Sequence, residues 1–215
     1  MKSISFEDLE PGIKLLAVFG FACLLFGLMD ESYIEARLRF ALNPPAPTSG
    51  HSALVARQAT TTPDTLAIPS LGIEAPIIYA TGTSEAVFQS ALKRGVVHYP
   101  GTALPGAKGN TFIFGHSSDY VWNVNPYRNI FALLPQIKIG ARILVSDPTG
   151  RLFEYRVTGT RIVPADDLQA LRQGDKNIQT LTLQTSYPLG TALRRFLVQA
   201  EAVSPTSSTT GPQGR

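Results

Sequence analysis

The sequence predicts a mainly β fold, a closed or nearly closed barrel that follows an apolar N-terminal stretch and a proline-rich linker. Two observations support this prediction. Between about residues 61 and 203 the chain breaks into short apolar or alternating runs, which Gly, Pro and Asp separate. Many short strands at such spacing are typical of barrels rather than of alternating βα units. The second observation concerns the two ends of the chain. The N-terminal stretch 13–29 is too apolar, and the linker and the C-terminal residues 204–215 are too polar, to belong to the same core.

Seven runs are expected to be strands. They are residues 65–68, 75–79, 110–114, 142–146, 153–160, 179–185 and 196–202. A helix is expected over residues 84–92, with Ser84 as its N-cap and an apolar side that includes Phe88 and Leu92. Residues 129–134 are expected to form a second, shorter helix.

The longest apolar stretch, residues 13–29, carries one charge, Lys14, at its start. It lies near the short end of the range that can cross a bilayer. No small-x-small cleavage site follows, so an uncleaved transmembrane signal anchor is favoured over the alternative, a cleaved signal peptide. Lys2 and Lys14 precede the stretch while Arg37 and Arg39 follow it, so the positive charges alone leave the orientation open.

The remaining boundaries follow from composition. Residues 30–62 are expected to be a short helical stub and a Pro-rich linker, and residues 204–215 a disordered tail. This leaves residues 1–12 as a tail before the anchor and residues 63–203 as one folded domain. The net charge of +3 comes without a run of Lys and Arg, so nucleic acid is not an expected partner. The only cysteine, Cys23, lies within the apolar stretch and excludes an intramolecular disulfide.

Two constellations could carry chemistry. His116 directly follows an expected strand and a glycine, a position that often faces a cleft, although a capping or packing role is the alternative. Residues 181–186 end a second expected strand, and the strand that returns opens with Arg194 and Arg195. Because strand neighbours point to opposite faces, one of these arginines can enter a cleft while the other meets solvent. A fully solvated strand start is the alternative for both.

Three segments resemble the sortase family of bacterial cysteine transpeptidases. They are HYPGTALPG at 98–106, GNTFIFGHSS at 109–118 and LTLQTS at 181–186. Residues 127–143 are similar to the middle region of the same family, and the motifs keep their order over about residues 64–203. The resemblance implies a sortase-type eight-stranded closed barrel with one or two short helices. It also implies a single-pass cell-membrane protein with residues 1–12 in the cytoplasm and the C-terminal domain outside.

In the sortase family a strand-end histidine, a cysteine that ends a Thr-Leu-x-Thr-Cys strand and an arginine that opens the next strand form the active site. The resemblance therefore assigns His116 and Arg195 as catalytic, with Arg194 as a weaker candidate, and it puts Ser186 at the cysteine position. The residues expected to contribute to substrate binding are Thr185, Arg194, Trp122 and His98. Among these, Trp122 is expected to form a wall of the cleft and His98 to support the groove structurally.

The resemblance implies the partners as well. The substrates are LPxTG-like sorting-signal peptides of secreted surface proteins, and the acceptor is an amine of a cell-wall precursor or a pilin. No metal and no cofactor is expected, because the histidines lie in separate segments without ligand spacing and the acidic pair Asp166-Asp167 more often starts a helix.

The serine changes the chemistry. A free cysteine has a pKa near 8.5 and is about 3% thiolate at neutral pH, whereas a serine hydroxyl needs a base that a third group holds in the right tautomer. Asp119 is the only nearby carboxylate that could orient His116, and a surface loop acid is the alternative for it. Three interpretations stay open. Ser186 is a working nucleophile, the chain is an inactive relative that binds extended proline-containing peptides, or the serine was introduced to trap substrate.

Overall fold

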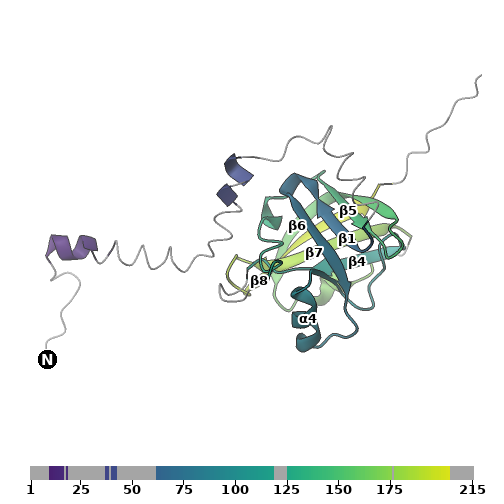
Figure 1. The fold of residues 1–215 in the computed structure, drawn as a ribbon, viewed down its shortest axis with the longest axis horizontal. Helices are drawn as coiled ribbons and strands as arrows, with labels where there is room; N and C mark the ends of the chain where they lie inside the picture. The colour runs from purple at the N-terminus through teal and green to yellow at the C-terminus, as the bar shows by residue number, and fades with distance from the viewer. Residues whose placement is uncertain are drawn as a thin grey trace, which may run out of the picture.

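The computed structural model describes residues 10–16, 18, 37–38, 40–42, 62–118, 125–175 and 177–203. In this part of the chain eight strands form a closed barrel (Figure 1). The strands are β1 (Thr65–Ile68), β2 (Ile73–Tyr79), β3 (Val96–His98), β4 (Gly109–Phe114), β5 (Arg142–Ser146), β6 (Leu152–Pro164), β7 (Gln179–Tyr187) and β8 (Arg194–Ala202). Their order around the barrel is β1-β2-β3-β4-β7-β8-β6-β5. The mainly β, closed barrel expected from the sequence is confirmed.

The pairing of the strands places the ends of β4, β7 and β8 side by side. β4 and β7 are parallel, with Phe114 opposite Gln184, while β7 and β8 are antiparallel. β2 and β3 form the other parallel pair, and the antiparallel pair of β1 and β5 closes the barrel. The chain therefore leaves β4 and β7 at the same edge, which is also where β8 begins.

β4 is buried on both of its faces, and its second half is the apolar run Phe-Ile-Phe at 112–114. Ile113 points into the main core together with Leu181 and Leu183 of β7. Phe112 points the other way, into a second apolar cluster outside the barrel that includes Leu197. Two elements cover this outer face. One is the helix after β2, and the other is the segment between β6 and β7.

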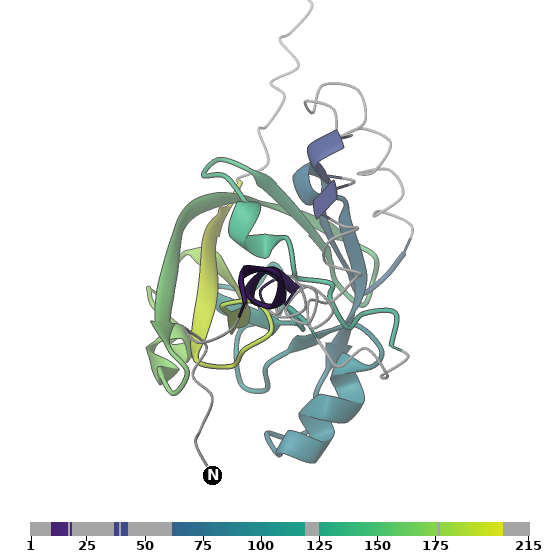
Figure 2. The ribbon, with the colours of Figure 1, turned by 90° about the vertical axis from the view of Figure 1, so that its left-hand side faces the viewer.

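The helix, α4 (Glu85–Leu92), confirms the helix expected over residues 84–92. The Ser84 side chain caps it by accepting a hydrogen bond from the Val87 backbone amide at 3.4 Å. Ala91 and Leu92 are buried against Val97 of β3, so the helix lies outside the barrel wall (Figure 2). One side of α4 therefore lies next to the C-terminal end of β4, where Phe88 contacts Phe114.

Two local predictions differ from the structure. β3 was not expected as a strand, because three residues between a helix and a Pro-Gly turn are too few for a periodic pattern. Residues 129–134 do not form the expected α-helix but turns that lead into the 3-10 helix η3 (Leu134–Gln136). In an α-helix the backbone amide of Phe131 would donate to the carbonyl four residues earlier, but here it donates to His116 O at 2.9 Å. Pro135 has no amide hydrogen to donate. Tertiary contacts thus interrupt the α-helical hydrogen bonds.

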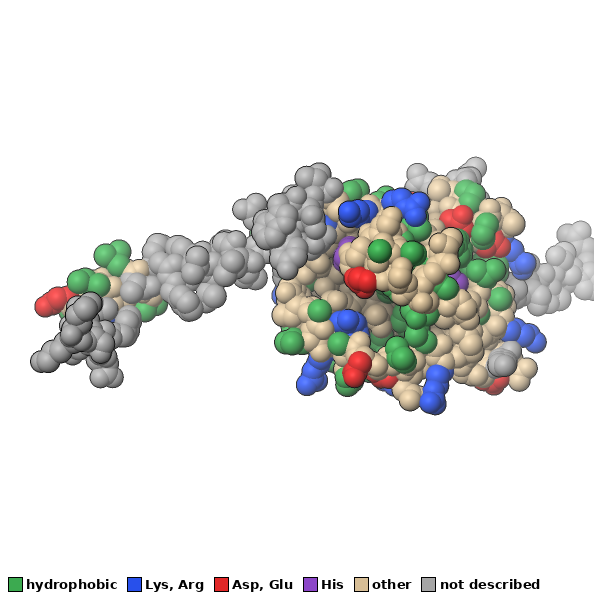
Figure 3. All heavy atoms as spheres, turned by 90° about the horizontal axis from the view of Figure 1, so that it is seen from below, with side chains coloured by type: hydrophobic (Ala, Val, Ile, Leu, Met, Phe, Trp, Pro, Cys, Tyr) green, Lys and Arg blue, Asp and Glu red, His purple; other side chains and the backbone are tan. Residues whose placement is uncertain are grey.

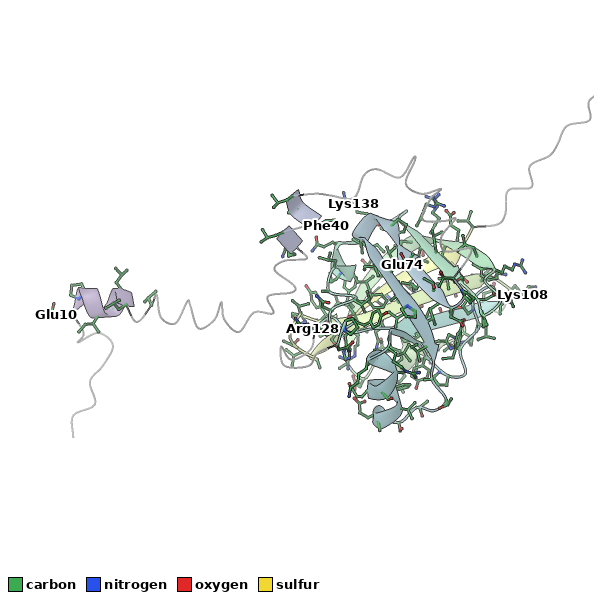
Figure 4. The ribbon with its side chains drawn as sticks, viewed as in Figure 1. Glu10, Phe40, Glu74, Lys108, Arg128 and Lys138 are labelled. Atoms are coloured by element: carbon green, nitrogen blue, oxygen red, sulfur yellow. The ribbon has the colours of Figure 1, made fainter. Side chains whose placement is uncertain are left out.

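Ahead of the barrel, the structure describes only short pieces. Residues 11–16 and 18 are helical, and the rest of the stretch 13–29 lies outside the described residues. None of the helices within the described ranges has both the length and the apolar character needed to span a bilayer. Within the expected stub, residues 37–38 and 40–42 are helical, and Phe40 packs against the barrel core (Figure 4). Residues 1–9 and 204–215 also lie outside the described part, so the domain boundaries proposed there stay predictions.

Candidate active site

His116 lies immediately beyond the end of β4, where tertiary contacts hold its backbone. The Gly115 amide donates to Gln184 O at 3.1 Å, which continues the pairing with β7 past the last residue of the strand. The carbonyl of His116 accepts from the Phe131 amide at 2.9 Å. A Cβ on Gly115 would lie 2.8 Å from the Phe131 ring and 3.2 Å from Val96, so only glycine allows this close approach. The imidazole is therefore presented from a well-anchored turn.

Ser186 and Arg195 are direct partners across β7 and β8. Residues directly opposite in an antiparallel pair project from the same face of the sheet, with Cβ atoms about 5 Å apart. The Arg195 guanidinium donates through Nη1 to Ala192 O at 3.0 Å and to Arg194 O at 3.1 Å. These two bonds hold the cation over the start of β8. The strand pairing thus brings a hydroxyl and a guanidinium together next to the histidine.

All three side chains line one cleft of about 270 Å³. Its lining residues come from four parts of the fold. Helix α4 supplies Glu85, Phe88, Gln89 and Leu92, and β4 with its flanking residues supplies Tyr99, Phe112, Phe114, Gly115 and His116. The β6–β7 segment supplies Ala165, Asp167, Leu168 and Leu171, and β7 and β8 supply Gln184, Thr185, Ser186 and Arg195. The cleft therefore combines aromatic and aliphatic side chains with polar groups, which include a histidine, hydroxyls and one guanidinium. An extended peptide fits such a cleft, because its side chains can pack against the apolar residues while one of its carbonyl groups lies next to the polar ones.

A second hollow, of about 330 Å³, lies along the opposite side of α4. It is lined by small residues of the helix and by the end of β2, and it holds none of the residues singled out from the sequence. Figure 3, which views the molecule from the side of α4, shows basic side chains scattered over this face instead of gathered in one patch. We assign the site to the smaller cleft because the reactive side chains meet there.

Two carboxylates, Glu85 and Asp167, also line the cleft. Each carboxylate accepts a hydrogen bond from a residue of its own segment. Glu85 Oε1 accepts from Gln89 Nε2 at 2.6 Å, and Asp167 Oδ1 accepts from the Gln169 amide at 2.8 Å. Within the described residues, no three His, Cys, Asp or Glu side chains gather closely enough to hold a metal ion. Besides these two carboxylates, the described part of the cleft offers hydroxyls, a histidine and a guanidinium.

The other residues expected to bind substrate lie in different places. Thr185 lines the cleft, but its buried hydroxyl donates to Gly115 O at 2.9 Å and so ties the two strand ends together. Arg194 is exposed and does not line the cleft, in contrast to Arg195. Trp122 and Asp119 lie outside the described residues. Their roles in binding and in orienting His116 stay predictions.

His98 lies at the end of β3 and is only 4% exposed. Its Nε2 atom is 2.9 Å from Ala103 O, and since a carbonyl only accepts, Nε2 carries the proton. Burial lowers the pKa of this imidazole. His98 does not belong to the cleft lining, and its contacts hold the turn at 99–103 that follows it. They agree with a supporting role, while the expected contribution to substrate binding stays a prediction.

The lowered pKa of His98 predicts a loss of stability in mild acid. Below about pH 6.5 the unfolded chain takes up a proton that the folded barrel does not, so the folded state becomes less favourable until the pH passes the lowered pKa. We expect the melting temperature of the parent to fall between about pH 7.5 and pH 5.5, and to fall less for His98→Gln. Glutamine can still donate to Ala103 O but does not titrate. Thermal unfolding of both proteins at several pH values checks this, and identical slopes would contradict it.

The sequence did not reveal most of the aromatic and aliphatic side chains that line the cleft. Phe112 and Phe114 share one face of β4, and His116 continues the same spacing just beyond the strand, a signal that a period of two could have revealed. The contribution of the β6–β7 segment had no comparable signal, because Leu168 is 70% exposed and becomes part of the cleft only when the segment crosses the sheet.

The comparisons with known proteins agree with this architecture. Residues 66–203 match the family model described as the sortase domain. Sortase E from Streptomyces avermitilis is 27% identical, with a TM-score of 0.52, and the alignment covers 66% of this chain and 89% of that one. For sortase A from Corynebacterium diphtheriae the identity is 25%, the TM-score 0.55, and the coverage 82% of this chain and 84% of that one.

Sortase C-1 from Actinomyces oris is 23% identical with a TM-score of 0.56, covers 80% of this chain and 99% of that one, and is a likeness of fold alone. None of the curated proteins searched matches this sequence. The family model spans most of the chain, and the closed eight-stranded barrel is the one that the resemblance implied. The chain belongs to the sortase family, transpeptidases that cleave sorting signals and pass them to amine acceptors.

Proposed function

We propose that this protein binds LPxTG-like sorting signals of secreted surface proteins in its cleft and transfers them slowly, with Ser186 in the position of the nucleophile. The observation that carries the proposal is the convergence of His116, Ser186 and Arg195 in one cleft that is also lined by aromatic and aliphatic side chains. The amino-terminal stretch 13–29 anchors the protein in the cell membrane, and the barrel stands outside the cytoplasm at the end of its linker. The serine, instead of a cysteine, limits the rate.

In the proposed reaction Ser186 Oγ attacks the carbonyl carbon of the Thr–Gly bond while the imidazole of His116 takes its proton. Arg195 lies opposite Ser186 and stabilises the negative charge that develops on the carbonyl oxygen. The C–N bond then breaks, and the leaving amine takes the proton from His116. The acyl group remains on Ser186 as an ester. An amine of the acceptor attacks that ester, a new amide forms, and the serine hydroxyl is restored.

The first step is the difficult one. A serine hydroxyl is many pKa units weaker as an acid than a thiol, so attack depends on a base that is held in place. The backbone of His116 is well anchored, which favours catalysis. A second candidate function is favoured by the serine itself. The domain then keeps the cleft as a binding module for extended, proline-containing peptides and performs no transfer.

Mass spectrometry of the purified full-length protein distinguishes these functions. After incubation with a Leu-Pro-Glu-Thr-Gly peptide, we expect a slowly formed adduct on Ser186 with the mass of the Leu-Pro-Glu-Thr acyl group. The adduct should be base-labile like an ester and absent from the Ser186→Ala protein. Binding of the peptide without any adduct would instead support the binding module, and absence of both would contradict the proposed function.

A further inference from the structure

The segment between β6 and β7, residues 165–175, forms the side of the cleft that faces α4. Its only regular structure is the short 3-10 helix η4 (Leu168–Leu171), which has little stability of its own. Even so, this segment supplies Asp167, Leu168 and Leu171 to the cleft. Something outside the segment must therefore hold it in place.

Asn110, near the start of β4, makes the first of these contacts. Its side chain is 4% exposed, and its amide nitrogen donates to Ala170 O at 3.0 Å and to Arg172 O at 3.3 Å. Its amide oxygen accepts from the hydroxyl of Thr182 on β7 at 2.9 Å. Both ends of the buried amide are thus satisfied, one by the barrel and the other by the β6–β7 segment.

Gln173 makes the second contact in the opposite direction, from the segment back to the barrel. Its Oε1 atom accepts from the amides of Ala103 at 3.2 Å and Asn110 at 3.3 Å. Its Nε2 atom donates to Asn110 O at 3.3 Å and to Leu171 O at 3.4 Å. Gly109 makes room for it, since a Cβ there would lie 2.8 Å from Oε1 and the φ of +110° suits glycine.

We infer that Asn110 and Gln173 are positioning residues for peptide recognition, which together clamp the β6–β7 segment over the cleft before the substrate arrives. The role in recognition rests on the proposed function, while the clamp itself does not. If the segment were loose, part of the binding free energy would be spent on ordering it. The apparent dissociation constant rises in inverse proportion to the fraction of molecules in which the segment is in place.

The test uses Gln173→Ala and Gln173→Met, since methionine keeps the length of the side chain but none of its four hydrogen bonds. Gln169→Ala is the matched control, because Gln169 lies in the same segment, is exposed and does not line the cleft. Asn110 is left intact, since it also joins β4 to Thr182 and its loss would mix effects on the barrel with effects on the segment.

The first measurement is hydrogen exchange of residues 165–175 in the full-length protein. We expect faster exchange there in both Gln173 variants, unchanged exchange in the strands, and parent-like exchange in Gln169→Ala. The second measurement is the affinity for a fluorescent Leu-Pro-Glu-Thr-Gly peptide, in a Ser186→Ala background that prevents turnover. We expect the dissociation constant to rise about 10-fold for both Gln173 variants, as when about a tenth of the molecules keep the segment in place.

The outcomes separate the clamp from the proposed function. Unchanged exchange in the Gln173 variants would overturn the clamp, and faster exchange with unchanged affinity would overturn its role in recognition. If the Ser186→Ala protein binds no sorting peptide at all, the proposed function fails. The exchange data then decide the clamp alone.

Discussion

Replacing Ser186 by cysteine is expected to increase transpeptidation by on the order of 100-fold or more. A general base typically increases the rate of such a reaction by a factor of 10² to 10⁴. A thiol depends on this assistance far less than a hydroxyl, because a fraction of the thiol groups is already ionised at neutral pH. Transfer of a Leu-Pro-Glu-Thr-Gly donor to a glycine-based amine, followed by chromatography, measures the gain. The new activity should be lost on treatment with a thiol-alkylating reagent.

The chain provides its own controls for this experiment. Cys23 is the only cysteine of the sequence, so the parent protein, which retains it beside Ser186, shows whether alkylation elsewhere changes transfer. Adding His116→Ala to Ser186→Cys should remove most of the gain. If the Ser186→Cys protein melts like the parent yet transfers no sorting peptide, Ser186 is not at the nucleophile position and the proposed active site is wrong.

Removing the guanidinium of Arg195 is expected to have the second-largest effect. In the Ser186→Cys background, Arg195→Ala should lower kcat/KM by about 10² to 10³, as is typical when a group that stabilises an oxyanion is lost. Arg195→Lys should recover only part of the loss, because an ammonium lacks the planar, fork-shaped set of donors of a guanidinium. Steady-state kinetics of transfer measure both variants.

Arg194→Ala is the matched control, since it removes the same charge from the neighbouring residue, which is exposed and does not line the cleft. A surface change of this kind is expected to leave kcat/KM within about twofold of the parent. Arg195 also donates to Ala192 O, so thermal unfolding must show that the Arg195→Ala barrel stays folded. Equal losses for the two arginine variants would contradict the assignment of Arg195.

The strands that proved easiest to predict are those whose pattern is local. β4 ends in the apolar run 112–114, Leu181 and Leu183 of β7 alternate with polar residues, and the Ser84 cap marks the start of α4. β3 is too short for any pattern, and only its pairing with β2 and β4 makes it a strand. The expected helix at 129–134 fails for a related reason, since a distant carbonyl, that of His116, takes the Phe131 amide.

The sequence by itself determined the family, the mainly β class and the residue types at the strand ends, because these depend on composition, short motifs and periodicity along the chain. Tertiary structure alone decided which arginine faces the cleft, where His98 points, and that Gln173 joins the β6–β7 segment to the barrel. These properties depend on strand register and on contacts between residues far apart in sequence, such as Ala103 and Gln173. A one-residue shift of register reverses the face of every side chain on a strand, and no local pattern records the register of β8 against β7.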